Sequence, residues 1–284
     1  MSQLPKTPSF IKASDYFTIE TLTHPGAIHK QNQDAILINQ RVHQSSGFIS
    51  TGYLETTSPH LIAISDGVSQ SPNPSKASRT VLQGLLQSWE SKPDSTPIQH
   101  KESIQDYLDK ATNKKLSGMS ATLVAALYNN QKFTIINSGD SRAYLIDALG
   151  ITQLSKDHTT LQRMLDDGDI TKEEAANASS LYDGLDQCFV ARSLDGPPRI
   201  HTCTVALKPG QLLLLCSDGL NLYLSDDEIW DRIMNSESIG NGVVQLGEKA
   251  IARGGEDNIS IICIGYSTEM DLKFVGCNNK PEGH

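Results

Sequence analysis

The feature that most constrains this fold is a series of short apolar runs that end at turn-forming residues. In the clearest case, Leu61–Ser65 is followed directly by Asp66 and Gly67. A short continuous apolar run bounded by turn signals is typical of a buried strand. This run therefore predicts a buried strand that delivers an aspartate to the turn behind it. A chain with many such runs is expected to build its core from sheets.

Strand and helix patterns cover most of the chain, without an internal repeat or an evident interdomain linker. Apolar residues at helical spacing occur in Ser75–Trp89, Ile98–Leu116, Ser225–Met234 and Gly240–Ala252. Strand-like segments are Tyr16–Thr23, Asp34–Asn39, Leu61–Ser65, Ser120–Tyr128, Lys132–Asn137, Arg142–Ile146, Ile151–Leu154, Ile200–Leu207, Gln211–Cys216, Ile259–Gly265 and Asp271–Val275. We expect the first two strands to form an antiparallel pair. The pattern predicts one α+β domain of many antiparallel strands with paired helices.

The chain is acidic, with 33 Asp and Glu residues against 24 Lys and Arg residues and a net charge of −9. Such a surplus repels a phosphate backbone unless the cations cluster, and no dense stripe of Lys or Arg occurs. We therefore expect no nucleic-acid partner. The same surplus leaves carboxylates available to bind divalent metal ions.

The cysteines and the N-terminal segment bear on the cellular compartment. The five cysteines include no Cys-x-x-Cys pair, and their odd number argues against a closed disulfide framework. Residues 1–15 are polar and lack the apolar stretch of a signal peptide. No run approaches the ~20 apolar residues of a membrane span. We expect a cytoplasmic protein with no membrane partner.

Five aspartates lie beside apolar runs, where the backbone enters or leaves a predicted strand. They are Asp34, Asp66, Asp140, Asp218 and Asp257. A single Asp-Gly after a strand is usually only a turn, but five such positions in one chain indicate more than turns. Carboxylates gathered in a cleft of low dielectric constant repel one another, so they either become protonated or are neutralised by cations. Mg²⁺ and Mn²⁺ favour oxygen ligands of this kind.

An ordered set of motifs surrounds these aspartates. In chain order, the motifs are Asn32-Gln33-Asp34, Ser65-Asp66-Gly67, Gly118 to Ala126, Asn137 to Tyr144, Leu154 to His158, Leu213 to Leu220 and Asp257 to Ser260. Each motif is weak alone, but the set in this order is specific. From Tyr16 to Gly265, the chain closely resembles the metal-dependent protein phosphatases of type 2C, in particular bacterial serine/threonine phosphatases.

The resemblance implies a four-layer α-β-β-α sandwich, in which two antiparallel sheets are flanked by helices. It places the phosphatase domain at residues 16–276, between polar tails at 1–15 and 277–284. Residues 159–187 occupy the place of the family's flap, and weak helical signals occur there at Thr159–Leu165 and Thr171–Ala178. We expect this flap to border the cleft and to take part in substrate selection.

The resemblance also implies a metal centre that holds two or three Mn²⁺ or Mg²⁺ ions. In this centre, Asp66 bridges two ions and the carbonyl of Gly67 binds the first. Asp218 and Asp257 bind the second ion, and Asp34 acts through metal-bound water. Bacterial members often hold a third, weaker ion between the counterparts of Asp140 and Asp218. The implied metal set is therefore Asp34, Asp66, Gly67, Asp140, Asp218 and Asp257.

The implied reaction is hydrolysis of phosphoserine and phosphothreonine by in-line attack of a metal-bridging water, without a covalent phosphoenzyme. The implied catalytic residues are Asp66, Asp218 and Asp34. The expected partner is a phosphorylated protein in a signalling pathway, together with a cognate serine/threonine kinase. We expect the phosphatase to be a monomer.

Other phosphatase chemistries do not fit the sequence. A cysteine-dependent phosphatase needs an arginine six residues after its cysteine, but Leu194 stands six residues after Cys188, and the other cysteines also lack it. An aspartyl-phosphate enzyme needs Asp-x-Asp, whereas Asp66 is followed by Gly67 and Val68. No Gly-x-x-x-x-Gly-Lys loop occurs, so nucleoside triphosphatase activity of that type is not supported.

Two positions depart from the family pattern. The family's phosphate-gripping arginine corresponds to His29, and its glutamate before Asp34 corresponds to Gln33. Histidine is only fractionally charged near neutral pH and cannot make a bidentate contact, while Gln33 removes a negative charge close to the second ion. His29 is therefore expected either to bind phosphate weakly or to be a surface histidine. Both departures motivate an alternative function, a catalytically weak family member that acts as a phosphoprotein-binding regulatory module.

Three further positions carry more limited expectations. Arg142 is expected to brace the turn at Asp140 rather than to touch substrate. His158 is expected to have a structural hydrogen-bonding role. Val68 stands where eukaryotic family members have a histidine that is a proposed general acid. Protonation of the leaving group is therefore expected to depend on metal-bound water.

Overall fold

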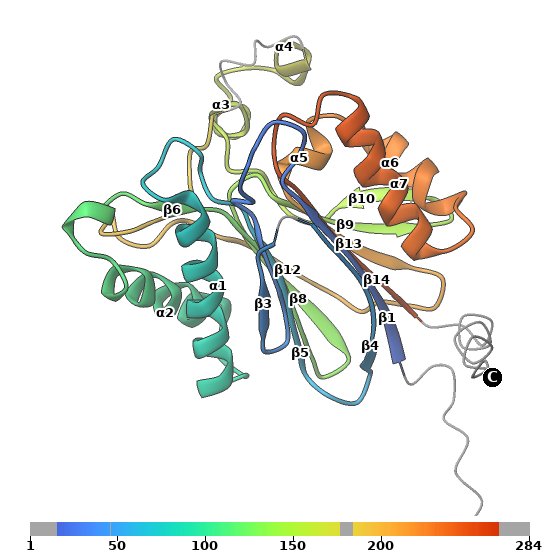
Figure 1. Ribbon diagram of the computed structural model, residues 1–284, viewed down its shortest axis with the longest axis horizontal. Helices are drawn as coiled ribbons and strands as arrows, with labels where there is room; N and C mark the ends of the chain where they lie inside the picture. The colour runs from blue at the N-terminus through green and yellow to red at the C-terminus, as the bar shows by residue number, and fades with distance from the viewer. Residues whose placement is uncertain (1–15, 46, 177–183, 267–284) are drawn as a thin grey trace, which may run out of the picture.

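The computed structural model of this chain describes residues 16–45, 47–176 and 184–266. Two antiparallel sheets lie at its centre (Figure 1). In spatial order, the first sheet contains β10 (Gly150–Gln153), β9 (Arg142–Asp147), β13 (Leu212–Cys216), β14 (Ile259–Tyr266), β1 (Tyr16–His24) and β4 (Phe48–Glu55). The second sheet contains β12 (His201–Val205), β8 (Lys132–Ser138), β7 (Leu123–Asn129), β5 (His60–Ser65), β2 (Ala35–Ile38) and β3 (Arg41–His43). A small ladder joins β11 (Phe189–Val190) to β6 (Ser120–Ala121).

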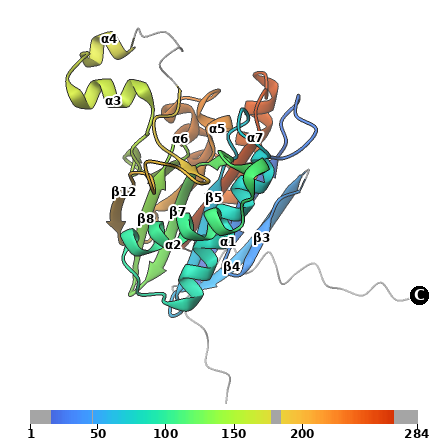
Figure 2. The same cartoon turned by 90° about the vertical axis from the view of Figure 1, so that its left-hand side faces the viewer.

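Helices cover the outer face of each sheet (Figures 1 and 2). The pair α1 (Pro74–Ser91) and α2 (Pro97–Lys110) covers the second sheet. The pair α6 (Asp226–Met234) and α7 (Ile239–Ala252) covers the first sheet. This arrangement confirms the expected α-β-β-α sandwich. The remaining helical elements are α3 (Thr160–Asp167), α4 (Lys172–Ala176), α5 (Asp218–Asn221) and a 3₁₀ turn, η2 (Lys114–Leu116).

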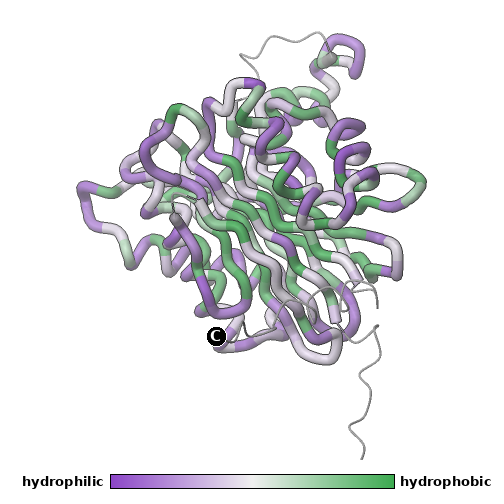
Figure 3. The backbone as a smooth tube through the Cα atoms, turned by 45° about the vertical axis from the view of Figure 1, so that its right-hand side comes forward, coloured by the Kyte–Doolittle hydropathy of each residue, from purple (hydrophilic) through white to green (hydrophobic). Residues whose placement is uncertain are grey.

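The core alternates along each central strand. In β5, Leu61 and Ala63 pack toward α1, whereas Ile62 and Ile64 pack between the two sheets, and all four are fully buried. Both faces of this strand are covered, which explains why its sequence is apolar throughout. Burial of each Leu or Ile side chain contributes about 2 kcal/mol. Figure 3 shows hydrophobic residues concentrated along the strands at the centre of the molecule.

Helix starts follow local capping signals. The side chain of Asn73 accepts a hydrogen bond from the backbone of Lys76, and Pro74 occupies the first turn of α1. Ser225 and Glu228 form a capping box at the start of α6. The second predicted helix is shorter than expected, because it ends at Lys110 rather than at Leu116. Asn113 accepts a hydrogen bond from the backbone of Lys115 and starts η2 instead. None of the described helices has the length and the apolar content needed to cross a membrane.

The prediction that the first two strands pair with each other was wrong. β1 lies between β14 and β4 in the first sheet, whereas β2 lies between β5 and β3 in the second. The chain therefore crosses from one sheet to the other through residues 25–34. This crossing brings Asp34 to the end of the second sheet. The edge strands β3 and β4 were not predicted, and the expected strand Asp271–Val275 lies outside the described residues.

Candidate metal centre

All five candidate aspartates lie where strands begin or end. The register of β2 and β5 sets Asp34 opposite Asp66. The register of β9 and β13 sets Asp140 opposite Asp218, just beyond the last paired residues. Asp257 precedes β14, the neighbour of β13. Antiparallel pairing in two sheets thus brings together residues that are far apart in the sequence.

Four of these aspartates line one cleft of about 390 Å³. They are Asp66, Asp140, Asp218 and Asp257. Asp34 is fully buried, and its charge is felt by both Asp66 and Asp218. The structure therefore brings together all the predicted metal-binding carboxylates.

The turn after β5 is fixed by its neighbours on both sides. The backbone N–H of Asp66 donates to Thr122 Oγ1 at 3.1 Å, and the backbone N–H of Thr122 donates to the Asp66 carbonyl at 2.8 Å. The N–H of Gly67 donates to the Gln33 carbonyl at 3.2 Å. A Cβ at Gly67 would lie 2.2 Å from the Pro74 carbonyl oxygen. Only glycine fits this close approach between the turn and the start of α1.

Asp34 is held by one of its two carboxylate oxygens. The hydroxyls of Ser217 and Ser260 both donate to Asp34 Oδ2, each at 2.7 Å. Its Oδ1 is buried and has no hydrogen-bond partner among the described residues. The motifs contain both serines, but sequence reasoning did not assign them a role. Each lies close to a candidate aspartate, Asp218 or Asp257, and this proximity was the available signal.

The Asp218 and Asp257 segments are packed tightly together. A Cβ at Gly219 would lie 2.0 Å from the Asn258 carbonyl oxygen, so the backbone at this position can approach only as glycine. The side chain of Asn258 accepts a hydrogen bond from the N–H of Gln33 at 2.7 Å and donates to the Pro25 carbonyl at 2.8 Å. Asn258 therefore fastens the Asp257 turn to the segment that leads into β2.

Burial raises the pKa of each interior carboxyl group. The pKa of Asp34 is raised to about 6, that of Asp218 to about 7 and that of Asp140 to about 8, in each case with burial as the largest cause. The pKa of Asp66 is raised well above its usual range by burial and then by the charge of Asp34. The charge of Asp257 adds to the effect at Asp34 and Asp218. Without cations, these groups cannot all be ionised at neutral pH.

The oxygen atoms of the cleft suit hard divalent cations. Among the described residues, Asp34 Oδ1 and Asp218 Oδ1 are both buried without a hydrogen-bond partner. Such an unsatisfied atom costs about 1–3 kcal/mol, which a cation or its bound water offsets. The described lining of the cleft includes no His or Cys. Within the described ranges, no group of three or more His, Cys, Asp or Glu side chains is arranged so that it could hold a metal ion by itself. Mg²⁺ usually keeps several waters, so carboxylates that do not all reach one ion directly still fit it.

The two departures from the family pattern have defined surroundings. His29 Nε2 lies 3.9 Å from Asp257 Oδ1, and the two side chains are 31% and 32% exposed. The structure thus places His29 at the edge of the candidate centre, beside a predicted ligand. Its role in phosphate binding stays a prediction. Gln33 Oε1 accepts a hydrogen bond from the hydroxyl of Ser69 at 2.7 Å, so its side chain is held by the loop that follows Gly67.

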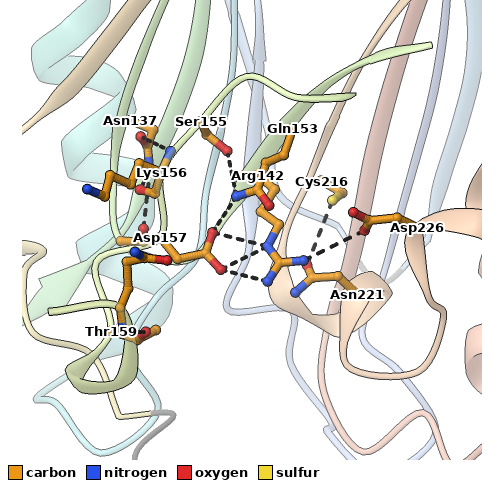
Figure 4. Close-up of polar contacts among 12 residues, drawn as sticks. Asn137, Arg142, Gln153, Ser155, Lys156, Asp157, Thr159, Cys216, Asn221 and Asp226 are labelled. Atoms are coloured by element: carbon orange, nitrogen blue, oxygen red, sulfur yellow. Dashed lines mark hydrogen bonds and ion pairs between the residues drawn. The ribbon is translucent and has the colours of Figure 1, made fainter. Parts of the chain in front are cut away.

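Arg142 forms an ion pair with Asp157 (Figure 4), and its role as a brace of the Asp140 turn stays a prediction. Its guanidinium group donates to both carboxylate oxygens of Asp157, at 3.0 Å from Nε to each oxygen and 2.6 Å from NH2 to Oδ2. NH1 of Arg142 donates to the hydroxyl of Tyr144 at 3.0 Å. Asp157 was not predicted from the sequence as the partner of Arg142. The two residues are fifteen positions apart, so no local pattern, such as the spacing of a helix, indicates their contact.

The described part of the flap contains α3 and α4, which agree with its weak helical signals. Gly184 and Leu185 line the cleft, so the flap borders the site as expected. Asp186 accepts hydrogen bonds from Arg163 of α3 at 3.0 Å and from Arg199 at 2.6 Å. Asp186 therefore ties α3 to the segment that leads into β12. A role of the flap in substrate selection stays a prediction.

Comparison with known protein sequences agrees with this geometry. The family described as Protein phosphatase 2C matches residues 23–164, half of the chain. This range includes Asp34, Asp66 and Asp140. Serine/threonine phosphatase stp of Listeria welshimeri serovar 6b is 29% identical over 217 residues, which cover 72% of this chain and 83% of that protein.

Solved structures share the fold. Serine/threonine phosphatase Stp1 of Staphylococcus aureus has a TM-score of 0.70 and 25% identity, and the match covers 87% of this chain and 94% of that chain. The catalytic domain of the phosphatase PstP, solved in complex with two manganese ions, has a TM-score of 0.65 and 22% identity. That match covers 88% of this chain and 98% of the other, and it concerns the fold alone.

Proposed function

The chain belongs to the protein phosphatase 2C family, and on this premise we propose that it is a metal-dependent serine/threonine phosphatase. The observation that carries the proposal is the set of four half-buried aspartates that line one cleft, with the fully buried Asp34 behind them. Asp34 and Asp218 each have one buried oxygen without a partner among the described residues. The relative from Listeria welshimeri, named as a serine/threonine phosphatase, supports the choice of substrate class.

The proposed ions are Mn²⁺ or Mg²⁺, in two sites with a third, weaker site. Asp66 and the Gly67 carbonyl would hold the first ion. Asp66 would share the second ion with Asp218 and Asp257, and Asp140 would join Asp218 at the third. The support for this assignment is the position of the residues around the cleft and the number of carboxylates that raise one another's pKa there. A solved relative in complex with two manganese ions supports the metal type.

When bound, a pair of divalent ions acidifies water and neutralises phosphoryl oxygens during in-line attack. The residues of the chain then orient the reactants. The hydroxyls of Ser217 and Ser260 fix Asp34 through its Oδ2, which leaves Oδ1 free to accept a hydrogen bond or a proton from water. Without bound ions, the pKa of Asp34 is raised to about 6, with burial as the largest cause.

Two side chains that contact the phosphate or the leaving group in the family pattern are replaced in this chain, at His29 and Val68. His29 would contact the phosphate only from the edge of the cleft, where it lies beside Asp257. Val68 lines the cleft at the position where eukaryotic members of the family have a histidine that is a proposed general acid, and its side chain has no acidic proton. Turnover therefore depends on the bound ions more than on a cationic or acidic side chain.

The alternative of a catalytically weak regulatory module rests on His29 and Gln33. The relatives that match this chain are named as phosphatases, which favours the enzyme. For the setting of the enzyme, we expect the cytoplasm, a cognate serine/threonine kinase and a monomeric state. Phosphorylated proteins are the substrates that the family implies.

The experiment that tests the function measures hydrolysis of p-nitrophenyl phosphate and of a phosphothreonine peptide, with Mn²⁺ and with excess chelator. We expect activity with Mn²⁺ only, and its loss in Asp66→Asn. Asp106→Asn is the matched control, since this aspartate lies on α2 with a side chain that is 76% exposed. Full activity in chelator, or equal activity of both variants, would contradict the function. Absence of turnover with intact metal binding would favour the regulatory alternative.

A further inference from the structure

Asp140 lies in a turn that one dipeptide, Asp157-His158, holds on both sides. His158 bonds to Gly139, the residue before Asp140. Asp157 bonds to Arg142, the second residue after Asp140. The dipeptide itself supplies no ligand in the proposed centre. Its contacts therefore concern the placement of Asp140 rather than direct contact with an ion or a substrate.

The contact between Arg142 and Asp157 is a rigid one. The guanidinium fork engages both carboxylate oxygens (Figure 4), and Gln153 Nε2 donates to Asp157 Oδ1 at 2.7 Å. The side chains of the ion pair are only 24% and 15% exposed. A shielded pair of this kind holds its geometry, because separating the partners would leave an uncompensated charge in a poorly solvated place.

The contact between His158 and Gly139 closes a ring of two hydrogen bonds. The N–H of His158 donates to the Gly139 carbonyl at 3.0 Å, and the N–H of Gly139 donates to His158 Nδ1 at 3.1 Å. The turn is also pressed against Thr122, since a Cβ at Gly139 would lie 2.6 Å from the Cβ of Thr122. Backbone movement before Asp140 is thus restricted from two directions.

Arg142 also reaches the start of α6. Its NH1 donates to the hydroxyl of Tyr144, which in turn donates to Asp226 Oδ1 at 3.0 Å. Tyr144 is fully buried. Asp226 begins α6, the helix that follows α5, and Asp218 is the first residue of α5. One arginine, two residues after Asp140, therefore joins the dipeptide to the start of α6.

We propose that Asp157 and His158 are positioning residues, which hold Asp140 opposite Asp218 so that the two carboxylates share one weakly bound divalent cation. The inference rests on the proposed function, because that function places a cation there. Two half-buried carboxylates that lie opposite each other repel, and they stay close only if the backbone on both sides is fixed. Substitution of a residue that holds a metal ligand in place typically lowers the metal affinity about 10–100-fold.

The test is a calorimetric titration of the full chain with Mn²⁺. The variants are Asp157→Ala, His158→Ala and the conservative Asp157→Glu. His158→Ala removes no partner of Arg142, so it keeps the test valid if Asp157→Ala fails to fold. Lys249→Gln is the matched control, because it breaks another ion pair to α6, at 2.8 Å from Glu228. Thermal unfolding in chelator measures any general loss of stability.

We expect both alanine variants to raise the Kd of the weakest Mn²⁺ site about tenfold or more, while the tighter sites keep their affinity. Asp157→Glu should recover part of the loss, and Lys249→Gln should match the wild type. If the Kd of the weakest site is unchanged in the alanine variants, the inference is wrong. It is also wrong if all sites weaken equally and in proportion to a fall in melting temperature. A wild type that is active with two ions and has no weaker site overturns this inference alone. A wild type that binds no Mn²⁺ overturns the proposed function.

Discussion

At the scale of the residue, Gly67 leaves very little room for a side chain. A Cβ there would meet the Pro74 carbonyl oxygen at 2.2 Å and the Gln33 carbonyl oxygen at 3.0 Å. We expect Gly67→Ala to cost about 1–3 kcal/mol of stability and to abolish Mn²⁺-dependent activity, since the turn must move. Gly184→Ala is the control for stability alone, because Gly184 lines the cleft but a Cβ there meets nothing within 4 Å. Thermal unfolding checks both variants and an activity assay checks Gly67→Ala, and equal stability of the two variants would contradict the close approach.

His29 is the residue at which a substitution should improve the enzyme. His29→Arg supplies a permanent charge and a bidentate fork at the edge of the cleft. We expect KM for p-nitrophenyl phosphate to fall about tenfold, the effect of one charge-assisted hydrogen bond, with little change in kcat. The neighbouring substitution Lys30→Arg is the control. Steady-state kinetics of the two variants decide the matter, and an unchanged KM in His29→Arg would count against phosphate contact at this position.

The raised pKa of Asp218 predicts a pH dependence of the metal-free protein. Its pKa is about 7 in the folded state against 3.8 ordinarily. The folded state therefore binds this proton more tightly than the unfolded state does. This preference stabilises the folded state fully below pH 3.8, and the stabilisation is lost as pH rises through about 7. We expect Asp218→Asn to gain stability over the wild type as pH rises from about 5 to about 8 in chelator. Urea unfolding measures the difference, and a gain that shrinks with pH would contradict the raised pKa.

The sequence predicted the aspartates of the cleft but not the side chains that hold them. Asp34 is identified by its motif, yet its hydrogen-bond partners Ser217 and Ser260 lie 183 and 226 residues away. Such contacts arise from the packing of two sheets, which no local pattern specifies. Arg142 was predicted to be a brace because it stands two residues from Asp140, whereas its partner Asp157 has no such local signal.

At the scale of the element, the flap is held by a small group of ion pairs. Asp186 joins Arg163 of α3 to Arg199, and its side chain is 19% exposed. We expect Asp186→Ala to loosen α3, so that trypsin cuts faster after Arg163. Turnover of a phosphothreonine peptide should fall, while that of p-nitrophenyl phosphate should not change, because the small substrate does not extend to α3.

The control for the flap is Asp167→Ala. Its carboxylate lies 3.6 Å from Arg163 NH1 and is 56% exposed, so this pair contributes little. Limited proteolysis and parallel assays with both substrates compare the two variants. Equal loss of both activities in Asp186→Ala would show general damage to the centre, and would contradict a separate role of the flap in substrate selection.

Elements with a strong local pattern were predicted well, and edges were not. The helix at Ser225–Met234 has a capping box and begins at Asp226 in the structure. The edge strand β4 was missed, because Ile49 points outward and is 63% exposed, which breaks the expected polar and apolar alternation. The pairing of β1 was assigned wrongly, since its buried residues suit a central strand between β14 and β4.

At the scale of the whole molecule, the sandwich explains why distant motifs meet. One sheet supplies Asp34 and Asp66, and the other supplies Asp140, Asp218 and Asp257 from its strand ends. The sheets are held in place by the apolar cluster between them and by a helix pair on each outer face. The net charge of −9 thus includes a local excess of carboxylates at the cleft. Two divalent ions bound there would bring the formal charge to −9 + 4 = −5.

The central claim is that these carboxylates form one metal centre, and anomalous diffraction from crystals soaked in Mn²⁺ tests it most directly. We predict two strong peaks beside Asp66 in the wild type and none there in Asp66→Asn. In Asp218→Asn, the peak between Asp218 and Asp257 should be lost. Asp106→Asn, the control on α2, should keep every peak. Peaks at another place, or an unchanged pattern in both cleft variants, would contradict the claim.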